Sequence, residues 1–126
     1  MNKTTSIEEL YQLFIQCGQK ITTDTRKLEA GSIFFALKGE NFDANTFAEK
    51  SIEGGCSYAI VDNPDVIRSE YILLVENVLE TLQQLAKFHR RQLRFPIIGI
   101  TGSNGKTTNK ELIHAVLKKK YKTYAT

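Results

Sequence analysis

The chain has 126 residues, of which 41% are hydrophobic and 25% charged, and its formal net charge at pH 7 is +3. This composition is typical of a soluble globular domain and excludes disordered and collagen-like chains. No apolar run is long enough to span a bilayer and no apolar signal core follows Met1, so we expect a cytoplasmic protein without a membrane partner.

The chain begins with a helix, a turn and a strand. Ser6 and Glu9 form a capping box ahead of apolar residues at helical spacing, which predicts a short helix that stops at Gly18. The polar segment 22–26 is turn-prone, whereas residues 32–37 are aromatic and apolar enough to form a buried strand.

A polar loop and a second helix come next. Residues 38–45 are polar and contain Gly39, which predicts a loop. Thr46 and Glu49 form a second capping box, so we expect a helix to open there and to end at Gly54.

Two strands and a longer helix follow. Residues 58–61 and 71–75 are short apolar runs bounded by turn residues, which predicts two strands. Apolar residues between Val78 and Leu93 recur at helical spacing and mark an amphipathic helix that is closed by Pro96. Strands that alternate with helices predict an α/β fold.

Pro96 also marks the expected start of a second unit. Residues 97–101 carry no charge, as expected of a strand that is covered on both faces. A loop then leads to an amphipathic helix over Lys106–Lys119, and residues 121–126 suggest the start of another strand. A strand, a helix and half a strand cannot enclose a core, so we expect this second domain to be cut off after Thr126.

The cysteines and the basic residues indicate no special ligand. Cys17 and Cys56 have no CxxC spacing and no histidine cluster, which favours reduced thiols over a disulfide framework or a zinc site. Basic residues gather within 90–94 and 118–122, where we expect helix ends, and cations suit the negative end of a helix dipole. No nucleic-acid-binding motif accompanies them, so we expect no nucleic-acid partner.

The loop before the last helix carries the G-K-T core of a Walker A motif. Gly102 and Gly105 let the backbone curl so that several N–H groups meet phosphate oxygens, and the helix N-terminus adds its dipole. Lys106 places a cation against the terminal phosphates, and the Thr107 hydroxyl would ligate nucleotide-bound Mg²⁺. We expect an ATP site, with Lys106 as its catalytic residue, formed by Gly102, Ser103, Asn104, Gly105, Lys106, Thr107 and Thr108.

The alternative interpretation is a glycine-rich turn with a surface lysine. The general motif has a glycine five residues before Gly105, where this chain has Ile100. The position of the loop, after an apolar segment and before an amphipathic helix, favours the phosphate site.

Residues Gly99–Thr108 resemble the P-loop of the Mur ligases, the ATP-dependent amide-forming enzymes of peptidoglycan precursor synthesis. In that family the position of Ile100 is not glycine, so the departure from the general motif is part of the resemblance. Three upstream segments resemble the uridine-nucleotide-binding domain of the D-alanyl-D-alanine-adding members: Asp24–Lys27, Phe34–Glu40 and Phe42–Ala44. One departure is Asn45, where a histidine is expected, and it could alter a contact near the nucleotide.

The resemblance implies a domain organisation and a second site. Residues 1–77 would form the UDP-substrate-binding domain, 78–95 a connecting helix, and 96–126 the start of a truncated central ATP-binding domain. The uridine nucleotide would be bound by Thr23, Thr25, Glu40, Asn41 and Phe42. The residues alone leave open that Asp24 and Thr25 form a plain turn and that Phe42 belongs to the core.

The resemblance also implies a reaction. ATP, with Mg²⁺, would phosphorylate the terminal carboxylate of UDP-N-acetylmuramoyl-tripeptide, and the amine of D-alanyl-D-alanine would attack the acyl phosphate. A carboxylate is a poor electrophile until its oxygen becomes a leaving group, which is why ATP is needed. The full-length enzyme is expected to be a monomer, and this chain alone to be inactive.

Two alternatives to this function stay open. One is a related ligase that adds a diamino acid, and the other is a non-catalytic nucleotide-binding module. A folylpolyglutamate synthase-like enzyme is disfavoured, since such enzymes share the P-loop but lack the uridine domain that the segment 24–44 resembles.

Overall fold

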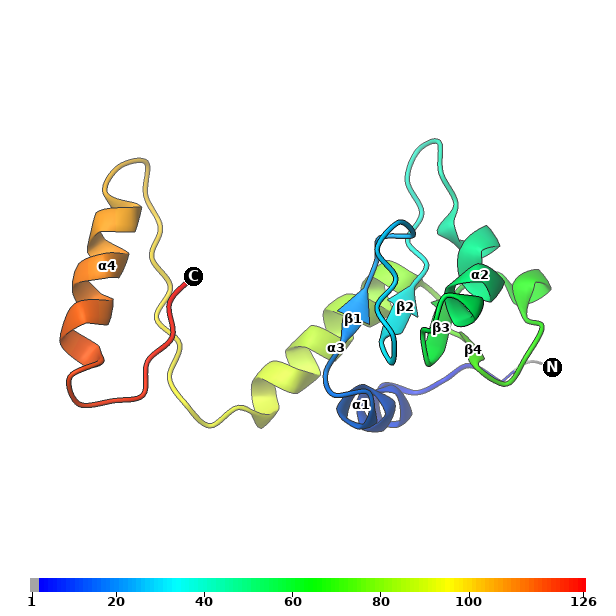
Figure 1. Cartoon of the computed structure of the whole chain (residues 1–126), viewed down its shortest axis with the longest axis horizontal. Helices are drawn as coiled ribbons and strands as arrows, with labels where there is room; N and C mark the ends of the chain where they lie inside the picture. The colour runs from blue at the N-terminus through cyan, green and yellow to red at the C-terminus, as the bar shows by residue number, and fades with distance from the viewer. Residues whose placement is uncertain (1–2) are drawn as a thin grey trace. The chain divides into compact units, whose positions relative to one another are not determined.

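The computed structural model describes residues 3–126 (Figure 1), which form two compact units that divide between Leu93 and Arg94. The second unit contains the helix α4 (Lys106–Leu117). The elements of the first unit are, in chain order, α1 (Ile7–Gln16), β1 (Ile21–Thr22), β2 (Ile33–Phe35), the 3₁₀ helix η1 (Ala44–Phe47), α2 (Ala48–Glu53), β3 (Tyr58–Val61), the 3₁₀ helix η2 (Pro64–Val66), β4 (Ile72–Leu74) and α3 (Val78–Gln92).

The strands of the first unit form one parallel sheet in the order β1-β2-β3-β4. The register pairs Phe34 of β2 with Ala59 of β3, and Ala59 with Ile72 of β4. Because the strands are parallel, the loops that follow them leave from the same edge of the sheet. The predicted α/β fold class is confirmed.

Both faces of the sheet are buried, by different helices. Ile33, Phe35 and Ile60 pack in one cluster with residues of α1 and α3, including Leu10 and Leu85. The alternate strand residues pack in a second cluster with Ala48 of α2: they are Phe34, Ala59 and Val61. Successive side chains of a strand point to opposite faces, which explains why these short strands are apolar without alternation.

The first helix and the third strand agree closely with the sequence. The Ser6 hydroxyl accepts the Glu9 N–H at 3.2 Å, and the Glu9 carboxylate accepts the Ser6 N–H at 2.9 Å, so the predicted capping box is present. The strand predicted over 58–61 is β3 (Tyr58–Val61).

The second predicted capping box is wrong. The Thr46 hydroxyl does not cap a helix but donates to the backbone oxygen of Asp43 at 3.0 Å. Asp43 is the capping residue instead, because its Oδ1 accepts the Asn45 N–H at 2.9 Å and starts the 3₁₀ helix η1. The helix α2 follows at Ala48, with no side-chain cap.

A short edge strand was not predicted. The segment 22–26 was expected to be only a turn, but Ile21 and Thr22 pair with Ile33 and Phe34 as strand β1. A strand of two residues is too short to show a hydrophobic periodicity, so the sequence does not distinguish it from the polar turn that follows.

Two strands predicted for the second unit are absent from the described residues 94–126. The segment 97–101, expected as a strand buried on both faces, is irregular, and the exposed fractions of Ile97 and Ile98 are 56% and 59%. Residues 121–126 form no strand either. A strand needs a hydrogen-bonding neighbour, and this unit pairs the segment with none.

The helix α3 packs within the first unit. It contacts α1, and the ring centroid of Phe88 lies 4.8 Å from that of Tyr11. The division into residues 1–77, 78–95 and 96–126 stays a prediction. Within residues 3–126 no helix has the length and apolar character needed to cross a membrane.

Candidate functional site

The glycine-rich loop before α4 has the backbone conformation that its glycines permit. Gly102 has φ +139° and Gly105 has φ +76°, and both values lie in a backbone region that residues other than glycine rarely adopt. Gly105 is the N-cap of α4, and its backbone oxygen accepts the Asn109 N–H at 2.9 Å. No side chain caps this helix, so its first N–H groups are available to an anion.

The predicted P-loop side chains lie around this helix N-terminus. Lys106 and Thr107 are the first two residues of α4, and the whole stretch 102–108 is exposed. A polyphosphate fits this arrangement, since backbone N–H groups, an ammonium group and a hydroxyl are brought to one helix end. Among residues 3–126 no group of three histidine, cysteine or acidic side chains could hold a metal ion by itself.

The residues expected to bind uridine lie on the loops after β1 and β2, which Figure 1 shows at the same edge of the sheet. Thr23 and Thr25 follow β1, with Thr23 exposed and Thr25 half-buried. Glu40, Asn41 and Phe42 form the exposed tip of the loop after β2. In open parallel sheets this carboxyl edge is where ligands bind.

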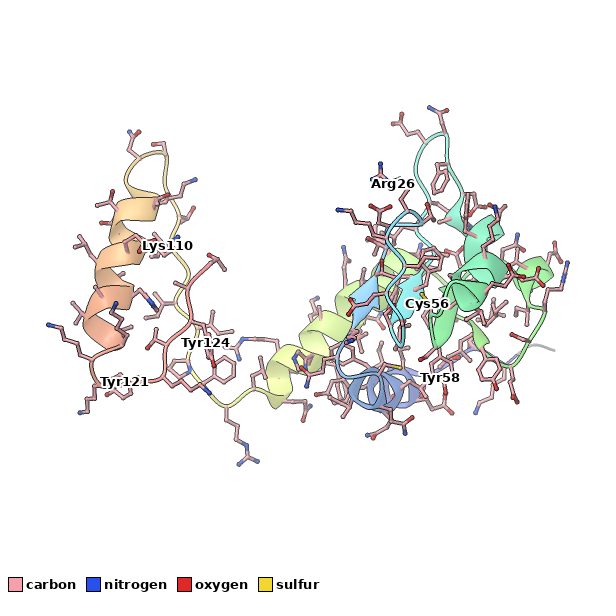
Figure 2. The ribbon with its side chains drawn as sticks, viewed as in Figure 1. Arg26, Cys56, Tyr58, Lys110, Tyr121 and Tyr124 are labelled. Carbon is pink, nitrogen blue, oxygen red and sulfur yellow. The ribbon has the colours of Figure 1, made fainter. Side chains whose placement is uncertain are left out.

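The turn after β1 is ordered by Asp24 and Arg26, the second of which is labelled in Figure 2. The Asp24 carboxylate accepts the Arg26 backbone N–H at 2.9 Å and two guanidinium N–H groups at 3.0 Å each. These hydrogen bonds lower the pKa of Asp24 to about 2. Asp24 is thus a turn-forming residue, and Thr25 is the half-buried residue between it and Arg26 in the sequence.

The loop after β2 is closed at its base and exposed at its tip. Lys38 and Asp43 form an isolated antiparallel bridge, and the Gly39 N–H donates to the Phe42 oxygen at 2.7 Å. Phe42 is 49% exposed, and its ring centroid lies 5.5 Å from that of Phe47. Phe42 is therefore not a core residue, and part of its ring is accessible to a ligand.

Sequence reasoning missed the central residue of this edge, Asp62, which directly follows β3. Its Oδ1 accepts the Lys38 ammonium at 2.7 Å and the Asn45 amide at 3.0 Å, and its Oδ2 accepts the Val78 N–H at 3.2 Å. Burial raises the pKa of the Asp62 carboxyl, but these hydrogen bonds outweigh burial and hold the pKa below its ordinary value. The available signal was a charged residue immediately after a buried strand.

Asn45, where the family resemblance leads us to expect a histidine, belongs to the same network. The side chain is fully buried. Its amide donates to Asp43 Oδ1 at 2.7 Å as well as to Asp62, and its oxygen accepts the Asp62 N–H at 3.1 Å. Asn45 therefore joins the loop after β2 to the end of β3.

A cavity of about 690 Å³ opens at the other edge of the sheet, at the amino ends of the strands. Its lining includes Cys17, Lys20, Cys56 and Tyr58, of which Figure 2 labels Cys56 and Tyr58. Lys20 is paired with Glu29 at 3.0 Å. None of the residues expected to bind uridine lines this cavity, so size alone does not identify the nucleotide site.

Comparison with known proteins connects both halves of the chain to one family. A family model described as the Mur ligase middle domain matches residues 100–126. The UDP-N-acetylmuramoyl-tripeptide–D-alanyl-D-alanine ligase of Bacillus subtilis is 44% identical over 108 residues, which are 84% of this chain and 24% of that protein. The UDP-N-acetylmuramoyl-L-alanyl-D-glutamate–2,6-diaminopimelate ligase of Aquifex aeolicus is 34% identical over 121 residues, 92% of this chain and 25% of that protein.

The structure is similar to solved Mur ligases. The crystal structure of the MurF ligase from Thermotoga maritima in complex with ADP superposes with a TM-score of 0.67 at 32% identity, covering 80% of this chain and 23% of that one. This chain spans about a quarter of the length of the relatives that it matches. The sequence and structure comparisons agree, and the chain belongs to the Mur ligase family.

Proposed function

We propose that this chain carries the nucleotide-substrate site and the P-loop of a cytoplasmic, ATP-dependent ligase that adds D-alanyl-D-alanine to UDP-N-acetylmuramoyl-tripeptide. The observation that carries the proposal is a match to ligases of that name over 84% of the chain, at 44% identity in the Bacillus subtilis protein. Because the match covers a quarter of that protein, further catalytic groups would come from outside these residues.

At the glycine-rich loop, the proposed role is to hold and orient a nucleotide. ATP would supply the phosphoryl group that activates the substrate carboxylate. The N–H groups at the start of α4 would bind phosphate oxygens, and the Lys106 ammonium would offset their negative charge. The Thr107 hydroxyl would ligate the Mg²⁺ that accompanies the nucleotide. Support comes from the left-handed backbone at Gly105 and from the ADP complex of the Thermotoga maritima relative.

At the carboxyl edge of the sheet, the proposed role is to recognise uridine. The hydroxyls of Thr23 and Thr25 and the loop over Glu40–Asn41 can hydrogen-bond the polar edge of a base, and Phe42 offers a half-exposed ring for stacking. Binding at this edge would fix the substrate before its carboxylate reacts.

A second candidate is the ligase that adds a diamino acid. The Aquifex aeolicus protein of that name matches a larger share of the chain, 92%, although at the lower identity of 34%. The two candidates use UDP-linked substrates of different peptide length and different amine acceptors, which makes them separable by assay.

The test is a chimera in which this chain replaces the matching segment of the Bacillus subtilis ligase. We expect ATP-dependent phosphate release with UDP-N-acetylmuramoyl-tripeptide and D-alanyl-D-alanine, and loss of that release with Lys106→Ala. Lys110→Ala, a lysine one turn further along α4, is the matched control and should keep activity. A chimera that binds UDP-N-acetylmuramoyl-L-alanyl-D-glutamate in place of the tripeptide substrate supports the second candidate. Turnover retained by Lys106→Ala contradicts the P-loop role.

A further inference from the structure

The loop over residues 38–43 is attached at both ends to one buried network. At its start, the Lys38 ammonium lies 2.7 Å from Asp62 Oδ1. At its end, Asp43 Oδ1 accepts the Asn45 amide at 2.7 Å, and the same amide nitrogen donates to Asp62 Oδ1 at 3.0 Å. Both ends of the loop are therefore linked to Asp62 Oδ1, directly through Lys38 at the start and through the Asn45 amide at the end.

Burial strengthens the hydrogen bonds between Asn45 and Asp62, whereas the Lys38 side chain that pairs with Asp62 is 49% exposed. The exposed fraction of the Asp62 side chain is 10%, and Asn45 is fully buried. An exposed ion pair contributes little, whereas hydrogen bonds to a largely buried carboxylate are weakly screened by solvent. The tip of the loop, with Glu40, Asn41 and Phe42, is exposed. A rigid base thus supports an accessible tip.

The second oxygen of the carboxylate holds a different element. Asp62 Oδ2 accepts the N–H of Val78, the first residue of α3, at 3.2 Å. A carboxylate is favoured at a helix N-terminus, where N–H groups are free. Val78 is itself buried in the core cluster that contains Leu85, so this oxygen ties the network to the packed interior.

From this arrangement we propose that Asp62 is a positioning residue of the nucleotide-substrate site, holding the loop 38–43 in its binding geometry before the substrate arrives. Asp62 does not touch the substrate in this account; it acts through Lys38 and Asn45. Preorganising a loop improves affinity, because less conformational entropy is lost on binding. The identity of the substrate rests on the proposed function, whereas the positioning of the loop does not.

The experiment compares Asp62→Asn with wild type in the 126-residue chain, and Asp65→Asn is the matched control. Asp65 is exposed on η2, three residues further on, and its substitution makes the same chemical change outside the network. The first readout is hydrogen exchange of the Gly39 amide, which closes the loop through Phe42. The second is the affinity for UDP-N-acetylmuramoyl-tripeptide by calorimetry.

We expect Asp62→Asn to speed Gly39 exchange and to weaken substrate binding, each by about tenfold, as for the loss of one charged hydrogen bond. Asp65→Asn should match wild type in both. If Asp62→Asn does not fold, Lys38→Met releases only the start of the loop and should give the same two changes in a smaller degree. A merely structural role would lower the melting temperature without a selective change at Gly39.

The two readouts separate failure of this inference from failure of the proposed function. If Gly39 exchanges faster in Asp62→Asn but wild type does not bind the substrate, the positioning role of Asp62 is supported and the proposed identity of the substrate is contradicted. Substrate binding by wild type with unchanged exchange and affinity in both folded variants overturns the positioning.

Discussion

The side chain of Asn45 and the residue Asp62 bind each other twice, through the Asn45 amide to the carboxylate at 3.0 Å and through the Asp62 N–H to the Asn45 oxygen at 3.1 Å. The two residues are 17 positions apart, one in the 3₁₀ helix η1 and the other just after β3. This pairing fixes the loop after β2 against the carboxyl edge of the sheet.

Replacing Asn45 with alanine should destabilise the first unit strongly. The substitution leaves the carboxylates of Asp43 and Asp62 without a shared buried donor. We expect a loss of about 3 kcal/mol in the free energy of unfolding, measured by urea denaturation. Asn63→Ala is the matched control; Asn63 only caps the exposed 3₁₀ helix η2, and its loss should cost about 1 kcal/mol. Equal losses for the two variants would show that the buried network adds little.

Acid should weaken the fold through two carboxylates with lowered pKa values. The pKa of Asp24 is about 2 because of hydrogen bonds from Arg26, and the pKa of Asp62 also lies below its ordinary value. A lowered pKa in the folded state contributes stability above the unfolded value, near 3.8, and this contribution is lost as the pH falls through the folded value. The melting temperature should therefore drop between about pH 4 and pH 2.

The variant Asp62→Asn should flatten this pH dependence, since it removes one of the two titrating groups. A melting temperature that falls as steeply in the variant as in wild type would mean that other groups control the acid response.

A glycine substitution should test the P-loop backbone. Gly105 has φ +76°, so Gly105→Ala strains the N-cap of α4 by about 1 kcal/mol or more. In the chimera with the Bacillus subtilis ligase we expect kcat/KM for ATP to fall about tenfold or more, because the N–H groups that bind phosphate move. Gly18→Ala is the control, since Gly18 has φ +66° and open space around the added methyl group but lies outside the P-loop. An unchanged Gly105→Ala enzyme would exclude this backbone conformation from the nucleotide complex.

The packing of α3 on the first unit should be visible in a pair of leucine substitutions. Leu85 is 1% exposed within the core cluster, whereas Leu79 on the same helix is 53% exposed. Leu85→Ala should lower the free energy of unfolding by about 3 kcal/mol, through lost burial and a cavity, and Leu79→Ala by less than about 1 kcal/mol. Similar values for the two would contradict the observed burial of α3.

Local patterns predicted most of the first unit. The capping box of Ser6 and Glu9 and the apolar run 58–61 are short-range signals, and both appear in the structure as expected. The capping box predicted at Thr46 is wrong because Asp43, three residues earlier, caps the 3₁₀ helix η1 with its carboxylate, and the Thr46 hydroxyl donates to the Asp43 backbone oxygen instead. A capping motif therefore locates the start of a helix only approximately where a second capping side chain lies nearby.

The candidate site was less predictable, because it depends on contacts across the sheet. The segments around Thr25 and Phe42 could be selected by resemblance, but Asp62 becomes central only when the parallel strands bring it beside Lys38 and Asn45. In the second unit, the apolar run 97–101 predicts a strand, but the segment is irregular in the structure. A strand forms only beside a neighbouring strand with which it can exchange hydrogen bonds.

The nucleotide substrate is proposed to bind at the carboxyl edge of the four-stranded sheet. The direct measurement is a titration of the isotope-labelled chain with UDP-N-acetylmuramoyl-tripeptide, followed by amide chemical shifts. We expect saturable shifts at Thr23, Thr25 and the loop over 40–42. Shifts confined to the opposite cavity, around Cys17 and Tyr58, or no saturable shift at all, would contradict this proposal.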